Sequence, residues 1–361
     1  MFRIPTLNLP KSILKTNFKK YHTQHRNLLQ LSGYQFEVPN KDNSFPRVLI
    51  TGSLGQLGLG LTKALRDKYG ANNVIASDIR KPPSAFLGSG PFVYADVLNK
   101  AQLESLIVDF RIDYVIHFSA LLSAVGEKNP IRALEVNLMG FQNVIELAKT
   151  HNLRVLMPST IGAFGPSTPA VNTPDLTIMR PTTIYGITKL HAELLGEYYN
   201  EKFGVDFRSA RYPGIISADT APGGGTTDYA VEIFHDAIAN KDFTSFLRAD
   251  TRLPMMYLPD CLKGTIQLLE ADNAKLKRRT YNMAAFSFTP QEIYEKIKER
   301  RPDFKIQYKP DFRQAIADSW PQSLDDTNAR KEWDWSPDYD LDSMVDEMLA
   351  KLSDPNFKVV N

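Results

Sequence analysis

The sequence predicts an α/β fold in which a doubly wound parallel sheet is joined to a smaller C-terminal lobe. From Pro46 onward, short apolar runs alternate with segments of helical periodicity, which is typical of a parallel sheet covered by helices. The first apolar run leads directly into a turn with glycines at every third position, as in Rossmann-type folds. A hydrophobic content of 43% over 361 residues is sufficient for a core of this size.

The predicted strands of the main sheet are short and largely apolar. They cover Val48–Thr51, Val74–Asp78, Phe92–Tyr94, Tyr114–Phe118, Val155–Pro158 and Phe207–Tyr212. The helices predicted between them cover Leu57–Tyr69, Lys100–Phe110, Pro130–His151 and Tyr185–Phe203. We expect these elements to form a dinucleotide-binding domain over residues 45–217.

The alternation weakens after Ser217. Helical patterns there are joined by proline-rich connections, and they cover Asp228–Asn240, Asp260–Glu270, Pro290–Arg300 and Leu341–Leu352. We expect a substrate lobe over residues 218–355, with some of its segments returning to the main sheet.

The N-terminal segment differs in composition from the rest of the chain. No Asp or Glu precedes Glu37, whereas six Lys and Arg residues and several spaced apolar residues do. This composition is typical of a transit peptide, and it predicts a mitochondrial leader over residues 1–40. The alternative interpretation is a disordered basic tail.

Charge and cysteine content exclude several classes of protein. Without the six basic residues of the leader, 37 Lys and Arg remain against 41 Asp and Glu, a net charge near −4. This is not the balance of a nucleic-acid-binding protein. No apolar run is long enough to span a membrane. The single Cys261 excludes an intramolecular disulfide and a cysteine-built metal cluster, and we predict no metal site.

The glycine-rich turn is the predicted cofactor-binding segment. It comprises Gly52, Ser53, Leu54, Gly55, Gln56, Leu57 and Gly58, between a strand and a helix. Backbone N–H groups and a helix N-terminus can approach a pyrophosphate closely in such a turn.

Asp78 lies 20 residues beyond Gly58, at the end of the second predicted strand. A carboxylate there can accept hydrogen bonds from an adenosine ribose, and it favours NAD over NADP because it repels a 2′-phosphate. Arg80 can partly offset that repulsion, and a strand-end turn residue is the alternative role for Asp78.

Other strand ends are expected to border the same cofactor. These neighbours are Ile79, Asp96, Val97 and Ser119. His117 lies within an apolar strand pattern, so a buried, hydrogen-bonded imidazole is favoured over a catalytic one.

The chain contains three Tyr-x-x-x-Lys pairs, beginning at Tyr185, Tyr198 and Tyr294. Of the three pairs, Tyr185 and Lys189 are the predicted catalytic pair because of their position in the chain. Tyr185 opens a helix, and it follows a strand that ends in the hydroxyls of Ser159 and Thr160. A lysine ammonium one turn away favours the phenolate form of a tyrosine. With the glycine-rich turn, this pair predicts a nicotinamide-dependent oxidoreductase.

These motifs resemble the extended short-chain dehydrogenase/reductases. The resemblance is carried by Thr51–Gly58, Asp78, Asp96, Thr160, the Tyr185/Lys189 pair and the closing segment Asp325–Pro337, and it extends over about Phe45–Leu352. Within that family, residues 119–124, 158–165, 211–217, 222–230 and 253–257 are similar to members that oxidise L-threonine. Sugar-nucleotide epimerases of the same fold do not carry the 222–230 segment.

The resemblance implies NAD-dependent oxidation of L-threonine to L-2-amino-3-oxobutyrate, by a homodimer in the mitochondrial matrix. Tyr185 would act as the base, with its pKa lowered by Lys189 and by the cationic nicotinamide. Lys189 would also bind the nicotinamide ribose, Thr160 would donate a hydrogen bond to the reacting oxygen, and Ile215 would flank the nicotinamide.

A free amino acid needs both charged ends recognised. Thr226, Thr227 and the N–H groups of Gly223–Gly225, including Gly224, are candidates for binding the carboxylate. Ser123 is a further candidate for this pocket. Arg180 either contributes a cation or forms a structural ion pair.

Two other functions remain open from sequence. One is a sugar-nucleotide epimerase or dehydratase on the same fold, and the other is a non-catalytic, NAD-sensing module. Intact Thr160, Tyr185 and Lys189 argue against the second.

Overall fold

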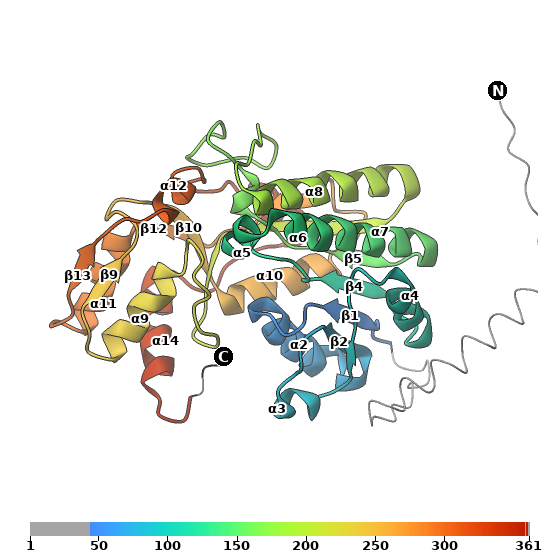
Figure 1. The fold of residues 1–361 in the computed structure, drawn as a ribbon, viewed down its shortest axis with the longest axis horizontal. Helices are drawn as coiled ribbons and strands as arrows, with labels where there is room; N and C mark the ends of the chain where they lie inside the picture. Colours follow the sequence, from blue (N-terminus) through green and yellow to red (C-terminus); the bar gives the residue numbers. More distant parts are fainter. Residues whose placement is uncertain (1–43, 358, 360–361) are drawn as a thin grey trace, which may run out of the picture. The chain divides into compact units, whose positions relative to one another are not determined.

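The computed structural model describes residues 44–357 and 359 (Figure 1). The predicted leader, residues 1–40, lies outside the described residues. From Phe45 onward the chain forms a compact unit. None of its described helices is long and apolar enough to cross a membrane.

The main sheet has the strand order β11-β7-β5-β4-β1-β2-β3, with the two-residue β6 paired to β7. All of its pairings are parallel. The strands are β1 (Val48–Thr51), β2 (Val74–Asp78), β3 (Phe92–Tyr94), β4 (Tyr114–His117), β5 (Arg154–Leu156), β6 (Ser159–Thr160), β7 (Asp206–Tyr212) and β11 (Thr280–Asn282). The order reverses between β1 and β4, so the predicted doubly wound α/β class is confirmed.

Successive residues of the buried strands serve the two faces of the sheet. Leu49 packs in one core with Phe141 and Phe207, whereas its neighbours Val48 and Ile50 pack in the other. Side chains alternate across a strand, so a sheet covered on both faces needs continuous apolar strands. This explains why these strands were predictable from sequence.

Helices cover both faces, and α6, α7 and α8 lie together along one side in Figure 1. The helices of this half are α2 (Gln56–Tyr69), α3 (Ser84–Leu87), α4 (Lys100–Asp109), α5 (Ser123–Lys128), α6 (Pro130–Leu134), α7 (Gly140–His151) and α8 (Ile184–Phe203). The short α3 and α5 were not predicted.

The predicted continuous helix Pro130–His151 is interrupted by a π-helical segment, Glu135–Met139. The buried Asn137 lies in this segment, where its side chain bonds both backbone groups of Leu121. Such wide turns often occur at functional sites.

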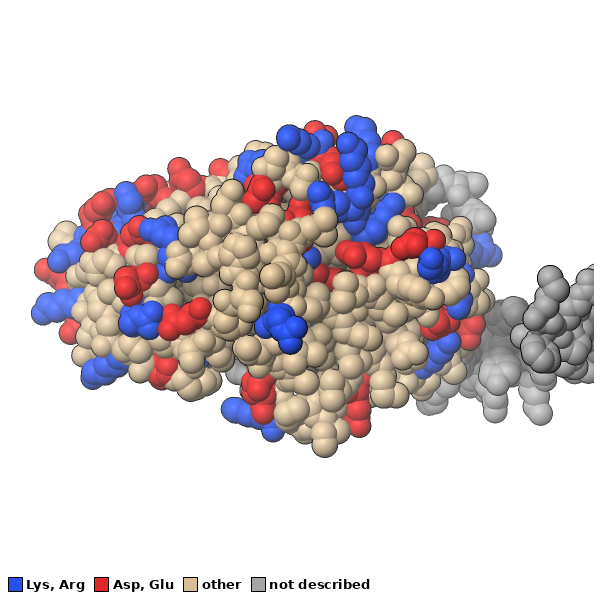
Figure 2. All heavy atoms as spheres, turned by 90° about the horizontal axis from the view of Figure 1, so that it is seen from above, with Lys and Arg blue, Asp and Glu red and all other residues tan. Residues whose placement is uncertain are grey.

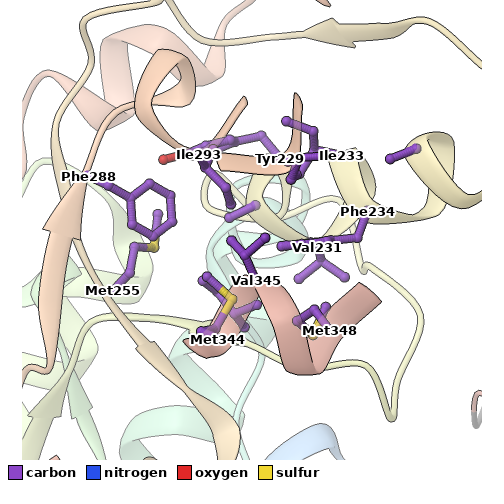
Figure 3. Close-up of a cluster of buried hydrophobic side chains, with 14 of the residues drawn as sticks. Tyr229, Val231, Ile233, Phe234, Met255, Phe288, Ile293, Met344, Val345 and Met348 are labelled. Atoms are coloured by element: carbon purple, nitrogen blue, oxygen red, sulfur yellow. The ribbon is translucent and has the colours of Figure 1, made fainter. Parts of the chain in front are cut away.

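The remaining elements form two small sheets and a second helical layer. The strands are β8 (Gly214–Ile216), β9 (Phe243–Ser245), β10 (Leu253–Tyr257), β12 (Phe286–Phe288) and β13 (Ile306–Tyr308). The helices are α9 (Tyr229–Ile238), α10 (Leu258–Glu270), α11 (Pro290–Arg300), α12 (Arg313–Ala317), α13 (Thr327–Trp333) and α14 (Leu341–Ser353). Figure 3 shows the apolar core shared by α9, α11, α14, β10 and β12, which includes Tyr229, Phe234, Phe288 and Val345.

The C-terminal half also contributes to the main sheet. β11 pairs with β7, while side chains of α10 and α13 enter the core on one face of that sheet. Trp335 is buried there beside Trp333. Elements after residue 217 therefore belong partly to the main sheet and partly to the small sheets.

Close packing of α8 on the sheet yields a stability prediction. A Cβ atom at Gly196 would lie 2.3 Å from the ring of Phe207, which is buried in the core. We expect Gly196→Ala to lower the free energy of unfolding by roughly 1–2 kcal/mol, because the overpacking cost exceeds the helix propensity gained. Urea denaturation measures the change. Gly88→Ala is the control, since its Cβ would meet only an atom 3.7 Å away; an equal loss there would contradict the packing argument.

Candidate active site

The first turn of α8 brings Tyr185 to the carboxyl-terminal edge of the sheet. Thr183 caps the helix by accepting a hydrogen bond from the Gly186 N–H at 3.1 Å. A Cβ atom at Gly186 would lie 2.0 Å from the carbonyl oxygen of Gly162, so only glycine permits this approach. The helix end is therefore pressed against the segment that follows β6.

Thr160 provides the hydroxyl beside the phenol. Its oxygen accepts a hydrogen bond from the Gly162 N–H at 3.1 Å. That bond leaves the hydroxyl proton available for a second acceptor, and Thr160 acts on the Tyr185 phenol to lower its pKa. A Cβ atom placed on Gly162 would lie 3.5 Å from the Thr160 side chain and 3.6 Å from the Tyr185 ring, so both side chains border this glycine. Thr160 and Tyr185 therefore lie close together at this edge of the sheet.

Lys189 lies one helical turn beyond Tyr185 and is buried. Its Nζ donates to the carbonyl oxygen of Pro158 at 2.7 Å and lies 5.7 Å from the centre of the Tyr185 ring. Burial lowers the pKa of Lys189 to about 8, and the carboxylate of Glu193 opposes that shift. The side chain is therefore mainly an ammonium at neutral pH.

Tyr185 itself does not have the lowered pKa that the sequence suggested. Burial raises the pKa of its phenol to about 12, and the hydrogen bond with Thr160 opposes this only in part. The expected lowering by Lys189 together with the cationic nicotinamide stays a prediction, because this value describes the protein without the cofactor. Desolvation of the phenolate dominates this shift, and a positive charge brought close to the phenol would oppose it.

The glycine-rich turn leads into the N-terminus of α2. Gly52 has φ +68°, and a Cβ atom there would lie 2.6 Å from the backbone nitrogen of Ser119. No side chain caps α2, and its first turn contains no acidic residue. The buried Ser53 hydroxyl also has no hydrogen-bond partner among the described residues. Free helix N–H groups and an unpaired hydroxyl fit the pyrophosphate of a dinucleotide.

Asp78 closes this turn from the end of β2. Its carboxylate accepts from the Leu54 N–H at 3.1 Å and from the Arg80 N–H at 3.0 Å. The exposed Arg80 guanidinium also pairs with it at 3.3 Å. The guanidinium donates to both oxygens, so together with the two backbone N–H groups it fills the about four acceptor positions of the carboxylate, and a ribose hydroxyl would have to displace the exposed Arg80 side chain. Arg80 neutralises part of its charge.

The comparisons with known proteins agree with this arrangement. The pattern of the NAD dependent epimerase/dehydratase family matches residues 48–284. A mitochondrial L-threonine 3-dehydrogenase from Bos taurus is 56% identical over 304 residues, covering 84% of this chain and 82% of the relative. The solved L-threonine dehydrogenase of Phytophthora infestans superposes with a TM-score of 0.83 at 56% identity, covering 85% of this chain and 98% of that one. A monomeric L-threonine 3-dehydrogenase from a metagenome gives a TM-score of 0.81 at 41% identity, covering 85% and 98%.

The chain belongs to the NAD dependent epimerase/dehydratase family. This membership and the relatives confirm the predicted resemblance, including its similarity to threonine dehydrogenases. The family also implies a nucleotide cofactor.

The other predicted cofactor neighbours occupy different environments in this family member. The Asp96 carboxylate accepts from the Leu98 N–H at 3.0 Å, which shapes the turn after β3. Val97 is buried, and its carbonyl accepts from Asn143. Ile79 is 66% exposed beside Asp78, whereas Ile215 lies on β8, next to the crowded Gly214.

The glycine-threonine segment is organised by an internal carboxylate that sequence reasoning missed. Asp228 accepts hydrogen bonds from the N–H groups of Gly223 at 2.7 Å and Gly225 at 2.8 Å. These two donors are therefore already engaged, contrary to their predicted availability for a substrate carboxylate. A carboxylate three residues after a glycine run could have signalled such a loop bond.

Thr226 and Thr227 differ in accessibility. Thr226 is buried, whereas Thr227 is half-buried with its methyl group directed at Gly214. Gly224 has φ +83° and is exposed, with open space around its Cα. Thr227 and Gly224 are therefore the accessible members of the predicted carboxylate site.

A cleft of about 610 Å³ opens beside this segment. It is lined by residues that include Val125, Thr182, Thr183, Gly223, Gly224 and Phe312. Ser123 begins α5 near this cleft and is half-buried. Arg180 is exposed, and no described carboxylate lies within 4 Å of it, so the structural ion pair considered from sequence is not formed.

Asn137 is a second residue that sequence reasoning missed. It bonds Leu121 on both backbone groups and the Thr188 hydroxyl at 3.1 Å. It also lines a cavity of about 10 Å³ with His117 and Lys189. The sequence signal that could have identified Asn137 is an asparagine at a core position of an otherwise apolar helix pattern. It fixes the chain after β4 against α8.

His117 is a buried imidazole, as predicted, and it gives a pH prediction. Its Nδ1 lies 2.9 Å from the Thr51 hydroxyl. Burial, with a smaller contribution from Lys189, lowers the pKa of His117 from 6.5 to about 3. The unfolded chain therefore binds this proton more readily, so stability is lost as pH falls below about 6.5.

We expect His117→Asn to reduce this acid sensitivity. Between pH 7.5 and 5 the wild type should lose about 2 kcal/mol more unfolding free energy than the variant. Urea midpoints at the two pH values measure the difference. The exposed His191→Asn variant is the control and should follow the wild type. Equal pH dependence in wild type and His117→Asn would contradict a neutral buried imidazole.

Proposed function

We propose that this chain is an NAD-dependent L-threonine 3-dehydrogenase that oxidises L-threonine to L-2-amino-3-oxobutyrate. The observation that carries the proposal is the convergence of Thr160, Tyr185 and Lys189 at one sheet edge, in a chain that is 56% identical to a named threonine dehydrogenase. A sugar-nucleotide epimerase function is not better supported by any relative of comparable identity.

In this proposal Tyr185 is the base. Its phenolate takes the proton from the substrate β-hydroxyl, while Thr160 donates a hydrogen bond to the same oxygen. Lys189 remains an ammonium and stabilises the phenolate. When bound, NAD supplies the oxidant, because its nicotinamide ring accepts the hydride from the β-carbon.

Cofactor binding follows from the same arrangement. The turn Gly52–Gly58 and the free N–H groups of α2 would hold the pyrophosphate, and Asp78 would hold the adenosine ribose. Asp78 favours NAD over NADP, although its pairing with Arg80 moderates the preference.

Substrate recognition is assigned to the accessible part of the glycine-threonine segment. Thr227, Gly224 and Ser123 would contact the charged ends of L-threonine, with Arg180 as an exposed cation nearby in sequence. Thr226 is buried and would act by shaping the loop. The segment from Gly223 to Asp228 contains no Lys or Arg, so it offers neutral donors instead of the cations that suit a diphosphate.

A homodimer is part of the proposal. Ile187, Leu194 and Tyr198 form an exposed apolar stripe on α8, beside the exposed Ile131 and Met139 of the α6–α7 region. Figure 2 looks onto this side and shows a broad area without charged side chains. Such a patch is typical of a subunit interface. One relative is described as monomeric. In this proposal, the exposed apolar face would therefore distinguish dimeric members of the family from monomeric ones.

Location in the mitochondrial matrix completes the proposal. It is supported by the acid-free, basic composition before Glu37 and by relatives named as mitochondrial enzymes.

The direct test of this function is NADH formation. We expect purified protein to form NADH from L-threonine and NAD, and to leave UDP-glucose unchanged. Turnover of the UDP-sugar without any activity on L-threonine would overturn the proposal in favour of an epimerase.

Tyr185→Phe tests the assignment of the base. The change keeps the ring but removes the ionisable hydroxyl, so kcat should fall by about 10²-fold or more while NAD affinity is retained. Tyr294→Phe is the matched control from another Tyr-x-x-x-Lys pair, and its hydroxyl bonds only a backbone carbonyl. Near-normal turnover by Tyr185→Phe would assign the base to another group.

A further inference from the structure

Glu193 forms a buried ionic cluster directly behind the catalytic helix turn. It lies one turn beyond Lys189 and two beyond Tyr185, so all three share one side of α8. Its carboxylate is 2% exposed and accepts two bonds from Arg211, with Nη2 at 2.8 Å and Nε at 3.0 Å. The hydroxyl of Ser159 donates to the same carboxylate.

This cluster and the lysine hold successive residues of one short segment. Lys189 bonds the carbonyl of Pro158, and Glu193 bonds the side chain of Ser159. The next residue is Thr160, whose side chain borders Gly162 together with the Tyr185 ring. Two adjacent bonds from α8 therefore fix β6 against the helix, and the position of Thr160 relative to the phenol depends on both.

The carboxylate also affects the charge on Lys189. The uncharged groups facing Lys189 from other elements are the neutral His117 of β4, Asn137 of the π segment and Met157 after β5. On α8 itself, Glu193 raises the pKa of the ammonium against the effect of burial. Arg211 of β7 lies on the far side of Glu193, where Asp175 and Asn282 also bind it.

We propose that Glu193 is a positioning residue for the reaction, acting through Ser159 on Thr160 and through its charge on Lys189. This inference rests on the proposed function, and it assigns Glu193 no contact with substrate or cofactor. If the Glu193–Arg211 ion pair had a purely structural role, it would not require the hydrogen bond from Ser159 to Glu193. It would also not require Glu193 to lie on the same side of α8 as Lys189.

Two variants separate the geometric effect from the electrostatic one. Ser159→Ala keeps the buried ion pair but removes the bond to β6, so kcat should fall about tenfold with an unchanged pH profile. Glu193→Gln removes the negative charge as well, which lowers the pKa of Lys189. Its pH profile of kcat should therefore move to lower pH, by roughly one unit. NAD affinity should be retained in both.

Asp206→Asn is the matched control, because it disrupts a part-buried ion pair with Arg208 at the opposite end of β7. It should lower stability while leaving kcat and its pH profile unchanged. If Glu193→Gln does not fold, Ser159→Ala decides the outcome.

Wild-type kcat in Ser159→Ala would overturn the geometric part, and an unshifted profile in folded Glu193→Gln would overturn the electrostatic part. Failure of the wild type to form NADH from L-threonine would instead overturn the proposed function. The two failures are therefore distinguishable.

Discussion

The structure of the candidate site depends on the docking of α8 against the end of β6. Three contacts define it: the close approach of Gly186 to the Gly162 carbonyl, the bond from Lys189 to Pro158, and the bond from Ser159 to Glu193. The first permits the approach, and the other two fix its register. Because Tyr185 and Thr160 stand on the two docked elements, their separation follows directly from this contact.

The docking leaves Lys189 buried and Tyr185 half-buried, and this sets their chemistry. Burial favours the neutral form of every group, so it raises the pKa of Tyr185 and lowers the pKa of Lys189. The protein by itself therefore holds the phenol protonated at neutral pH. A cationic nicotinamide near the phenol would oppose burial, so base strength would be coupled to cofactor binding. This coupling follows from desolvation, and no conformational change is required for it.

Prediction from sequence succeeded where one physical signal dominated. The strands β1, β2 and β4 are buried on both faces, so their apolar runs stand out. The strands β8 to β13 were missed because, after β7, the alternation of apolar runs with helical patterns weakens and short strands leave little periodicity. Sequence spacing also identified Tyr185 and Lys189 as neighbours, since helix geometry fixes that distance.

Other features depended on tertiary contacts that no local pattern records. Asp228 occupies the glycine N–H groups because the loop folds back on it, and the π segment follows from the buried bonds of Asn137. The effect of burial on the Tyr185 pKa was not foreseen for the same reason: residue spacing reports the nearby ammonium but not the depth of burial. The roles assigned to individual site residues remain predictions.

Direct titration of Tyr185 tests the central claim, that burial holds the phenol neutral until a second positive charge is present. ¹³C-labelled tyrosine followed by NMR, with Tyr185→Phe to assign the resonance, reports this pKa with and without NAD. The account predicts a pKa near 12 for the protein alone and a clear decrease when NAD binds. A pKa already below 10 in the protein alone, or one that NAD leaves unchanged, would contradict it.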